Sequence, residues 1–384
     1  MSMPLASSTA ASPLRVLFAA GGTGGHVYPA VAIADAVRAL RPNADVLFAG
    51  TRERMEWEAV PKAGYAIRPI TVAGLPRTLN LNLLRFPFRL LKGLAESRAL
   101  VRSFRPHVAV GTGGFVAGPV LLAASLAGVP VVIQEQNAFA GVTNRLLARR
   151  AAEVHVAFDE ARGAFPAGKA VVSGNPIRAA FKPTNPTKRA EGRAFFGIPE
   201  GARLLVVFGG SLGAQKVNEA LVAALPALLA DADVHVVWAT GPRYFERVEA
   251  HVKTGFDGSE RVHIVRYLDR MELAYAAADL VLCRAGAITC SELMATGTPA
   301  VLVPSPNVAE DHQTHNARSL ERAGAARLLP ETDLATLAPT LQTLLADAPA
   351  RARMATAALA LARPAAAASI AARVVALVEK PPPR

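Results

Sequence analysis

Residues 20–26, Ala-Gly-Gly-Thr-Gly-Gly-His, and residues 208–215, Phe-Gly-Gly-Ser-Leu-Gly-Ala-Gln, decide the fold prediction. Each glycine-rich run follows a strand-like apolar stretch and precedes a stretch with a helical pattern (29–40 and 217–229). A chain that passes from strand to helix through glycines directs unpaired backbone N–H groups at one point, which suits a phosphate. Neither run has the G-x-G-x-x-G spacing of a dinucleotide site, and no Asp or Glu ends the next strand to hold an adenosine ribose. The pattern therefore disfavours a nicotinamide or flavin enzyme and favours a sugar-nucleotide enzyme.

Apolar, β-branched runs alternate with helical patterns along the whole chain, which is typical of parallel sheets covered by helices. The predicted fold class is α/β, with two doubly wound, Rossmann-like parallel-sheet domains and a ligand cleft between them. Residues 1–13 are predicted to be a disordered tail, 14–177 an N-terminal domain and 178–363 a C-terminal domain. The last helix, at about 364–384 beyond Pro364, is expected to pack back on the N-terminal domain. The predicted strands lie at 46–49, 67–72, 108–110, 131–133, 154–158 and 170–172, then at 204–208, 234–239, 262–265, 280–283 and 300–303.

Composition narrows the class of protein. Of 384 residues, 52% are hydrophobic and 19% charged, as in a well-packed globular protein. The net charge of +12 is uneven, because residues 1–178 carry 20 Lys and Arg against 10 Asp and Glu. Few aromatic residues and no nucleic-acid motif make RNA or DNA the weakest partner for this basic half. Cys283 and Cys290 lack metal-site spacing and are interpreted as reduced, structural thiols of a cytoplasmic protein.

Two further segments bear on membranes. The uncharged run 115–133 is broken by Gly118-Pro119 and Gly128-Val129-Pro130, so it predicts a buried helix, a turn and a buried strand rather than a transmembrane helix. Residues 77–105 mix leucine and phenylalanine with seven basic residues and one acid, Glu96. Such a segment is an ordinary amphipathic helix with a solvated basic face or a patch that lies on an anionic leaflet.

Seven motifs follow one another along the chain, at 21–29, 111–115, 135–137, 174–178, 209–211, 283–292 and 311–316. Read together, they resemble the MurG family of bacterial peptidoglycan N-acetylglucosaminyltransferases. The resemblance runs from residue 15 to about residue 330, and the ordered set is far more specific than any one motif. Where this chain has Phe115 and Gln134, the family often has Tyr and His.

The resemblance implies a GT-B fold and transfer of N-acetylglucosamine from UDP-N-acetylglucosamine to lipid I, with a β-1,4 bond and inversion, giving lipid II. It implies no metal and no cofactor, and a peripheral place on the cytoplasmic face of the inner membrane. The anionic lipid surface would contact residues 77–105. The resemblance places the enzyme in peptidoglycan synthesis, which serves cell shape and division, and implies other cell-wall synthesis proteins as possible partners.

The resemblance also assigns site residues. His26 is the preferred general base, since a histidine titrates in the range that inverting transfer needs, and Glu135 is the reserve. Glu292 would accept both ribose hydroxyls, and Arg178 and Ser211 would contact the diphosphate. The remaining predicted substrate-binding residues are Thr23, Gly24 and Gly25 (acceptor diphosphate or donor sugar), Ala287, Ile288 and Leu268 (a uracil slot formed through backbone contacts), Thr289, Cys290 and Ser291 (the helix at that slot), and Asn137, Gln313 and Asn316 (sugar).

Structural alternatives stand beside these roles. His26 could be a packing or anion-binding residue, and Glu135 a strand-end carboxylate paired with an arginine such as Arg145. Thr289 to Glu292 also forms a capping-box pattern, S/T-x-x-E. Arg178 could lie on a hinge surface, and the glycines could serve only a tight turn.

Three other functions remain open from the sequence: another GT-B transferase, acting on a lipid or natural product; a non-catalytic nucleotide-sugar binder; and a UDP-N-acetylglucosamine epimerase, which should bring more carboxylates to the sugar.

Overall fold

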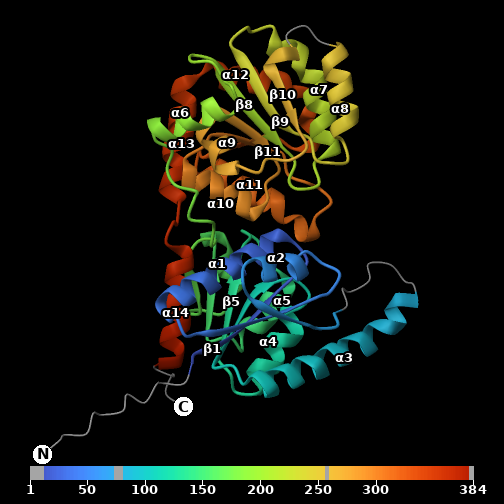
Figure 1. Ribbon diagram of the computed structural model, residues 1–384, viewed down its shortest axis with the longest axis vertical. Coiled ribbons are helices and arrows are strands. Elements are labelled where there is room, and N and C mark those ends of the chain that lie inside the picture. Colours follow the sequence, from blue (N-terminus) through green and yellow to red (C-terminus); the bar gives the residue numbers. More distant parts are fainter. Residues whose placement is uncertain (1–12, 73–80, 256–258, 380–384) are drawn as a thin grey trace, which may run out of the picture. The chain divides into compact units, whose positions relative to one another are not determined.

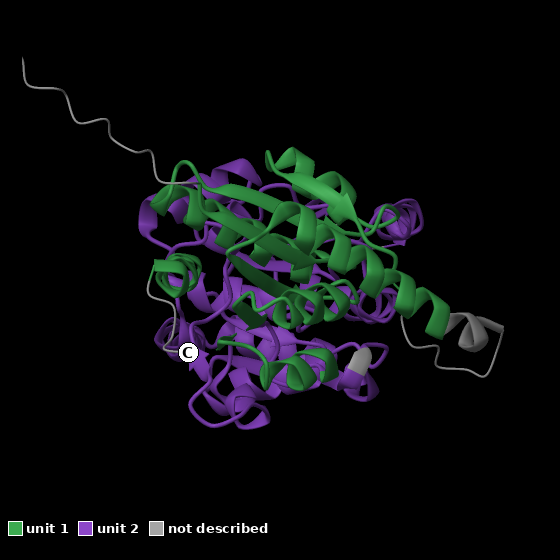
Figure 2. Ribbon diagram, turned by 90° about the horizontal axis from the view of Figure 1, so that it is seen from below, with its two compact units in different colours: residues 1–134, 142–155, 367–384 green, residues 135–141, 156–366 purple. Residues whose placement is uncertain are grey.

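The computed structural model describes residues 13–72, 81–255 and 259–379. The chain divides into two compact units (Figure 2). Unit 1 comprises residues 1–134, 142–155 and 367–384, and unit 2 comprises residues 135–141 and 156–366. Residues 135–141 and 156–177, which the sequence prediction placed in the N-terminal domain, thus have most of their contacts in unit 2. Most of the predicted disordered tail, residues 1–12, lies outside the described residues.

The first sheet has the strand order β3-β2-β1-β4-β5-β6-β7, and the pairs β1–β2, β1–β4, β2–β3 and β4–β5 are parallel. The order reverses at β1, so the carboxyl ends of β1 and β4 lie side by side at the point where open α/β sheets bind ligands. The elements are β1 (Arg15–Ala20), α1 (Gly24–Leu40), β2 (Asp45–Gly50), α2 (Glu56–Lys62), β3 (Ala66–Pro69), α3 (Leu81–Phe104), β4 (Val108–Gly113), α4 (Ala117–Leu126), β5 (Val131–Glu135), α5 (Val142–Ala148), β6 (Glu153–Val156), η1 (Asp159–Ala164) and β7 (Ala170–Val172).

The second sheet repeats this plan, with the order β10-β9-β8-β11-β12-β13 and the reversal at β8 (Figure 1). The second glycine-rich run therefore follows the strand that corresponds to β1. Its elements are α6 (Pro186–Phe195), β8 (Arg203–Phe208), α7 (Gln215–Leu229), β9 (Val234–Ala239), α8 (Phe245–Gly255), η2 (Ser259–Arg261), β10 (Val262–Val265), α9 (Met271–Ala277), β11 (Leu280–Cys283), α10 (Ala287–Thr296), β12 (Ala300–Leu302), η3 (Ala309–Asp311), α11 (His312–Arg322), β13 (Ala326–Leu328), η4 (Glu331–Thr336), α12 (Leu337–Ala346) and α13 (Ala348–Leu361).

Central strands are buried on both faces, which explains their lack of polar alternation. In unit 1, Phe18 of β1 pairs in register with Phe48 of β2, and their rings stack with centroids 5.1 Å apart. The same apolar cluster holds Ile33 of α1 and Ile370 of the last helix, α14 (Ala366–Glu379). In unit 2, Leu205 and Val207 face α7 and α12, whereas Leu204 and Val206 face α9 and α10.

Helix α1 begins at Gly24, five residues before the predicted start at Pro29. The sequence prediction gave the helical stretch as 29–40. The structure instead places Gly24, Gly25 and His26 in the first turn, with Thr23 as the N-cap residue. The correction matters because it puts the histidine at the positive end of the helix dipole.

The stretch Ala348–Glu379 is, by length and composition, apolar enough to cross a bilayer, and no other stretch of the described residues passes that test. It is not one helix, since α13 ends at Leu361 and α14 begins at Ala366, after Pro364. Fourteen residues of helix span about 21 Å, less than the roughly 30 Å of a hydrocarbon core. Ala358 of α13 and Val374 of α14 are buried in the cores of their units, so both helices are interpreted as core helices.

Candidate active site

The first glycine-rich loop ends in an anion-binding geometry within unit 1. Thr23 has extended backbone angles, and its carbonyl accepts the N–H groups of His26 and Val27 at 3.0 and 3.1 Å. The amides of Gly24 and Gly25, which come before them in the first turn, have no acceptor inside the helix, as at every helix N-terminus. No acidic residue lies in the first turn of α1. Together with the helix dipole, this end of α1 suits a phosphate or another anion.

The loop after β4 packs directly on this helix start. A Cβ on Gly114 would lie 2.1 Å from the carbonyl oxygen of Gly21, and one on Gly113 would lie 2.7 Å from Nδ1 of His26. Both glycines also have positive φ angles, 110° and 79° for Gly113 and Gly114. Side chains at these positions would push the two loops apart, so the glycines of the 111–115 motif are needed for the close approach.

The loop after β4 also orients His26. Nδ1 of His26 lies 3.1 Å from the carbonyl oxygen of Thr112, and the buried Thr112 hydroxyl donates to the carbonyl of His26 at 2.7 Å. A carbonyl oxygen only accepts, so this contact favours the tautomer with the proton on Nδ1. Nε2 is then the basic nitrogen of the ring.

In unit 2, a cavity of about 660 Å³ opens at the second glycine-rich loop. Three of the predicted substrate-binding residues line it: Ser211, Thr289 and Gln313. The other lining residues are Phe208, Gly209, Gly210, Leu212, Gly213, Ala214, Gln215, Lys216, Tyr244, Arg284, Gly286, Ser305, Asn307 and Glu331.

Backbone contacts fix the shape of the second loop. A Cβ on Gly213, whose φ is +77°, would lie 2.1 Å from the carbonyl oxygen of Thr240. The buried Asn218 of α7 donates to the same carbonyl at 2.9 Å and accepts from Trp238 Nε1 at 3.1 Å. Ser211 is exposed in the loop, four residues before α7 begins at Gln215.

Helix α10 presents a second N-terminus at the cavity, where Gly286 is its N-cap residue. The capping-box alternative for Thr289 to Glu292 is wrong, since the helix begins at Ala287 and both residues lie inside it. The first amides of the helix, at Ala287, Ile288 and Thr289, are of the kind that has no intrahelical acceptor. They remain suited to backbone contacts with a ligand.

The side chains of Cys290 and Ser291 do not fit the predicted contact with substrate. Both are buried, and the Ser291 hydroxyl donates to the carbonyl of Ala287 at 2.9 Å and accepts from Asn175 Nδ2 at 2.9 Å. Burial raises the pKa of Cys290 to about 12 and that of Cys283 well above its usual range. The two thiols are packing residues. The side chain of Leu268 is also part of the core, which is compatible with the backbone contact predicted for this residue.

Glu292 is partly buried, and the hydroxyl of Tyr275 donates a hydrogen bond to its Oε2 at 2.9 Å. Burial raises the pKa of Glu292 to about 7, and the Tyr275 hydrogen bond and the Arg178 charge oppose part of this rise. Tyr275 itself is fully buried, with edge contacts to Phe181 and Phe208 at 5.8 and 6.0 Å between centroids. Arg178 is exposed, with its guanidinium carbon 4.8 Å from the centroid of the Phe181 ring.

Glu135, Asn137 and Asn316 form one hydrogen-bonded network. The buried Glu135 carboxylate accepts the amides of Asn137 and Gly141, both at 3.0 Å, and Asn137 Nδ2 at 3.3 Å. The fully buried Asn316 accepts the Ala138 amide at 2.8 Å and donates to Asn137 Oδ1 and the Ala285 carbonyl at 3.2 and 3.1 Å. Asn316 therefore braces the loop that carries Asn137, and its predicted direct contact with the sugar is not supported.

Gln313 lies at the start of helix α11, which also carries Asn316, and it lines the cavity. Its Oε1 accepts the amide of Ser305 at 2.9 Å, which leaves the side-chain nitrogen as the donor end of the group. A donor at this position suits the hydroxyl and acyl oxygens of a sugar.

Several residues with evident roles escaped the sequence prediction. Arg284, at the end of β11, donates to the carbonyls of Val303 and Pro304 at 3.2 and 3.0 Å and forms an ion pair with Glu331. Arg284 thereby connects β11 to Glu331, and both residues line the cavity. Tyr275 was missed because it lies in an apolar helix, and Glu56 of unit 1 because its partners lie in other loops. Within the described residues, no group of three or more His, Cys, Asp or Glu could hold a metal ion.

Comparison with known proteins matches both units. The glycosyltransferase family 28 N-terminal domain matches residues 16–156, and the family 28 C-terminal domain matches residues 204–373. A UDP-N-acetylglucosamine–N-acetylmuramyl-(pentapeptide) pyrophosphoryl-undecaprenol N-acetylglucosamine transferase of Salinibacter ruber is 56% identical over 95% of this chain and 97% of its own. This chain belongs to glycosyltransferase family 28, and within it to the MurG family.

Further relatives agree with this assignment. The transferase of the same name from Flavobacterium psychrophilum is 42% identical over 83% of this chain and 85% of its own. The crystal structure of Acinetobacter baumannii MurG is 30% identical, with a TM-score of 0.76, and the match covers 94% of this chain and 99% of that one. The expected GT-B fold is thus confirmed, as is the expectation of an N-acetylglucosaminyltransferase.

Proposed function

We propose that this chain transfers N-acetylglucosamine from UDP-N-acetylglucosamine to lipid I, undecaprenyl-diphosphate-N-acetylmuramoyl-pentapeptide, and so makes lipid II. The observation that carries the proposal is the identity of 56% over 95% of the chain with the Salinibacter ruber transferase. Unit 2 holds the donor-binding groups, and unit 1 holds the acceptor-binding loop.

The donor is assigned to the cavity of unit 2 and to helix α10, which lines the cavity with Thr289 and carries Glu292 beyond that lining. Ser211 and the N-terminal end of α7 would receive the diphosphate, since helix dipole and N–H groups stabilise the charge that develops on the departing UDP. Glu292 would accept the ribose hydroxyls, and the side-chain nitrogen of Gln313 would donate to the sugar. Arg178 would add a positive charge for the diphosphate.

The acceptor is assigned to the start of α1 in unit 1, where Thr23, Gly24 and Gly25 offer backbone N–H groups. The acceptor hydroxyl oxygen attacks the anomeric carbon as the bond to UDP breaks, and UDP leaves with the bonding electrons. Nε2 of His26 takes the hydroxyl proton in this step, which general-base catalysis accelerates by roughly 10²–10⁴-fold.

His26 is a better base than Glu135 on the geometry of each group. The Glu135 carboxylate already accepts three N–H groups of its own loop, at 3.0 to 3.3 Å. In this position, Glu135 holds the loop around Asn137 in shape. In His26, by contrast, Nδ1 is directed at the carbonyl of Thr112. This contact fixes the tautomer in which Nε2 is the basic nitrogen.

An assay of the purified chain with radiolabelled UDP-N-acetylglucosamine and a short-chain lipid I analogue tests the proposal. The expected result is release of UDP and a lipid product extended by one N-acetylglucosamine in a β-1,4 bond, only when both substrates are present. Conversion of the donor to an epimer without acceptor would replace the proposal with epimerase activity. Transfer to other lipids or natural products but not to the lipid I analogue would assign a different GT-B activity.

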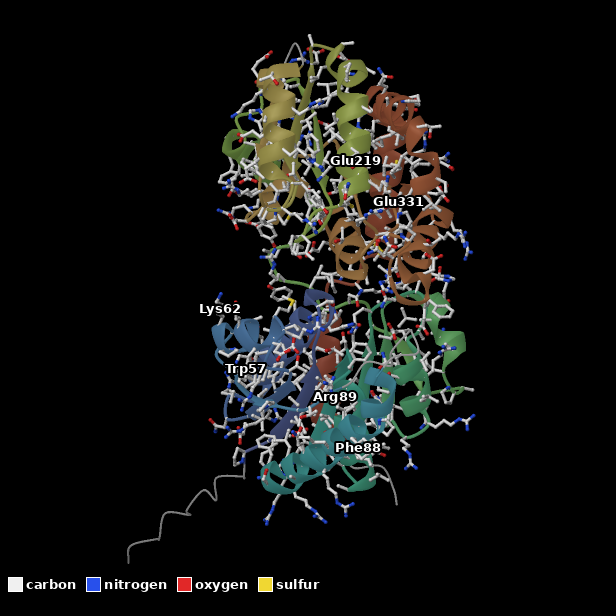
Figure 3. All side chains as sticks on the ribbon, turned by 90° about the vertical axis from the view of Figure 1, so that its right-hand side faces the viewer. Trp57, Lys62, Phe88, Arg89, Glu219 and Glu331 are labelled. Atoms are coloured by element: carbon white, nitrogen blue, oxygen red, sulfur yellow. The ribbon has the colours of Figure 1, made fainter. Side chains whose placement is uncertain are left out.

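We further propose that unit 1 binds the cytoplasmic leaflet through residues 77–105, of which 81–104 form α3. This helix projects from the rest of unit 1 (Figure 1), and Figure 3 shows Phe88 and Arg89 on it. Phe88 and Leu91 are 75% and 64% exposed, and Arg89, Lys92 and Arg98 are exposed beside them. Exposed apolar and basic side chains together suit an anionic lipid surface. Residues 77–80 lie outside the described residues.

Binding to anionic vesicles is expected to be reversible and to weaken as salt rises, because each basic residue near the surface contributes about 1 kcal/mol that salt screens. The double variant Arg89→Glu and Arg98→Glu should bind at least about 30-fold more weakly in a vesicle sedimentation assay, since two attractions are lost and two repulsions are added. Phe88→Asp should also weaken binding. Reversal of the exposed Arg353 of α13, Arg353→Glu, is the matched charge control for Arg89→Glu alone. Equal binding of wild type and double variant, or equal binding to neutral and anionic vesicles, would show that α3 is a solvated helix.

A further inference from the structure

The first residue of α2, Glu56, is a fully buried carboxylate that joins two loops of unit 1. Its Oε2 accepts the amide of Gly22 in the first glycine-rich loop at 3.0 Å. Its Oε1 accepts both the amide of Thr51 at 3.0 Å and the Thr51 hydroxyl at 2.6 Å. A single side chain thus ties the loop after β1 to the end of β2.

The surrounding backbone is shaped to receive this carboxylate. A Cβ on Gly21 would lie 2.7 Å from Glu56 Oε1, and one on Gly50 would lie 2.8 Å from Glu56 Cγ. Glycine at both positions therefore makes the room for the side chain. A buried charge is tolerated when donors surround it, and three donors meet the two oxygens here.

The contact determines which amides remain for a ligand. The N–H of Gly22 is directed at Glu56, so it is engaged inside the protein. Gly22 has a φ of +94°, which glycine adopts without strain. The chain then turns through the extended Thr23 into the first turn of α1. The N–H groups of that turn, and His26 within it, are the groups that the acceptor would meet.

We infer that Glu56 is a positioning residue for the transfer reaction: it holds the glycine-rich loop in the one shape that presents the α1 amides and His26 to the acceptor. This inference rests on the proposed function, since it assumes that the acceptor binds at the start of α1. Glu56 does not touch the substrate and acts through Gly22.

Glu56→Gln tests the inference with almost no change in size. Glutamine has one acceptor oxygen, so its amide nitrogen must face the backbone N–H of either Gly22 or Thr51, and the tie between the two segments is lost in either orientation. Because a misplacement of about 1 Å can cost about 10²-fold, kcat/KM for the lipid I analogue should fall by on the order of 10²-fold, through a higher KM and a lower kcat. The Kd for UDP, measured by calorimetry, should not change, because the donor groups lie in unit 2.

Asp35→Asn is the matched control. Asp35 lies on the same helix α1 and accepts the Tyr65 hydroxyl at 2.6 Å, away from the glycine-rich loop. This variant should lose some thermal stability and keep the kinetic constants of the wild type.

Three outcomes decide the inference. A loss of kcat/KM in Glu56→Gln with UDP affinity kept and a Tm close to that of Asp35→Asn supports it. A lower Tm with unchanged kcat/KM per folded molecule would overturn it and leave Glu56 a structural residue only. If Glu56→Gln does not fold, Thr51→Val, which removes one donor to Oε1, should give a smaller loss of kcat/KM, and no loss there would overturn the inference. Absence of transfer by the wild type would instead refute the proposed function.

Discussion

His26→Ala is expected to bind UDP as tightly as the wild type and to lose turnover by on the order of 10²–10⁴-fold. The proposed donor groups lie in unit 2, whereas His26 lies in unit 1, so its removal should leave the cavity of unit 2 intact. Turnover falls because alanine has no group that can take the acceptor proton at the end of α1. Single-turnover kinetics with saturating donor, together with calorimetry of UDP binding, measure the two quantities separately.

His26→Gln is the sharper form of the same experiment. A glutamine amide still donates toward the Thr112 carbonyl, which lies 3.1 Å from Nδ1 in the native chain, but it takes up no proton. If the role of His26 is packing, His26→Gln should keep most of the activity. If His26→Gln retained turnover and Glu135→Gln lost it, the base would be Glu135. Glu135→Gln is expected instead to cause a smaller loss, by loosening the loop of Asn137.

The glycine-rich loops and the strand pattern carried most of the fold prediction, because parallel strands buried on both faces leave continuous apolar runs. Two boundaries show the limits of that pattern. The start of α1 was placed at Pro29, since glycines have poor helix propensity, yet the packing of the 111–115 loop on Gly21 and His26 holds Gly24 and Gly25 in the helix. Strand β13 (Ala326–Leu328) was missed because its three residues, Ala-Arg-Leu, include no β-branched side chain.

The site could be predicted only as far as local sequence reaches. The loops that bear His26, Ser211 and Glu292 follow strands, so their place at the carboxyl ends of sheets was predictable. The bracing contacts were not, because their partners are remote in sequence: Asn316 bonds to Asn137, and Tyr275 holds Glu292. A sequence pattern gives residue types at a spacing. It does not say which polar groups form hydrogen bonds with each other.

Glu292→Ala is expected to weaken UDP binding by roughly 1.5–3 kcal/mol, the usual contribution of hydrogen bonds to a charged group. In the proposed complex both ribose hydroxyls donate to this carboxylate, so the alanine leaves two hydroxyls without their acceptor. Isothermal calorimetry at pH 8 measures the difference. An unchanged Kd in a well-folded Glu292→Ala protein would remove the ribose assignment.

The raised pKa of Glu292, about 7, makes the same interaction dependent on pH. The pKa lies above the ordinary value of 4.5, so the fold favours the neutral form. The stability from this group is therefore present below about pH 4.5 and is lost as pH rises to about 7, a change of about 3 kcal/mol at most. UDP binding runs in the opposite direction, because only the ionised carboxylate accepts both hydroxyls. Affinity should be roughly tenfold weaker at pH 6 than at pH 8.

Proton release separates this mechanism from a general effect of pH. When UDP binds near pH 7, Glu292 must lose its proton, so calorimetry in buffers of different ionisation enthalpy should detect a proton leaving the protein. Glu292→Gln should bind UDP weakly, with no release and a flatter pH profile. Tyr275→Phe keeps the contacts with Phe181 and Phe208 but removes the hydrogen bond that holds the pKa of Glu292 down, so its midpoint should move to higher pH. An unmoved midpoint in Tyr275→Phe would mean that another group governs the pH dependence of donor binding.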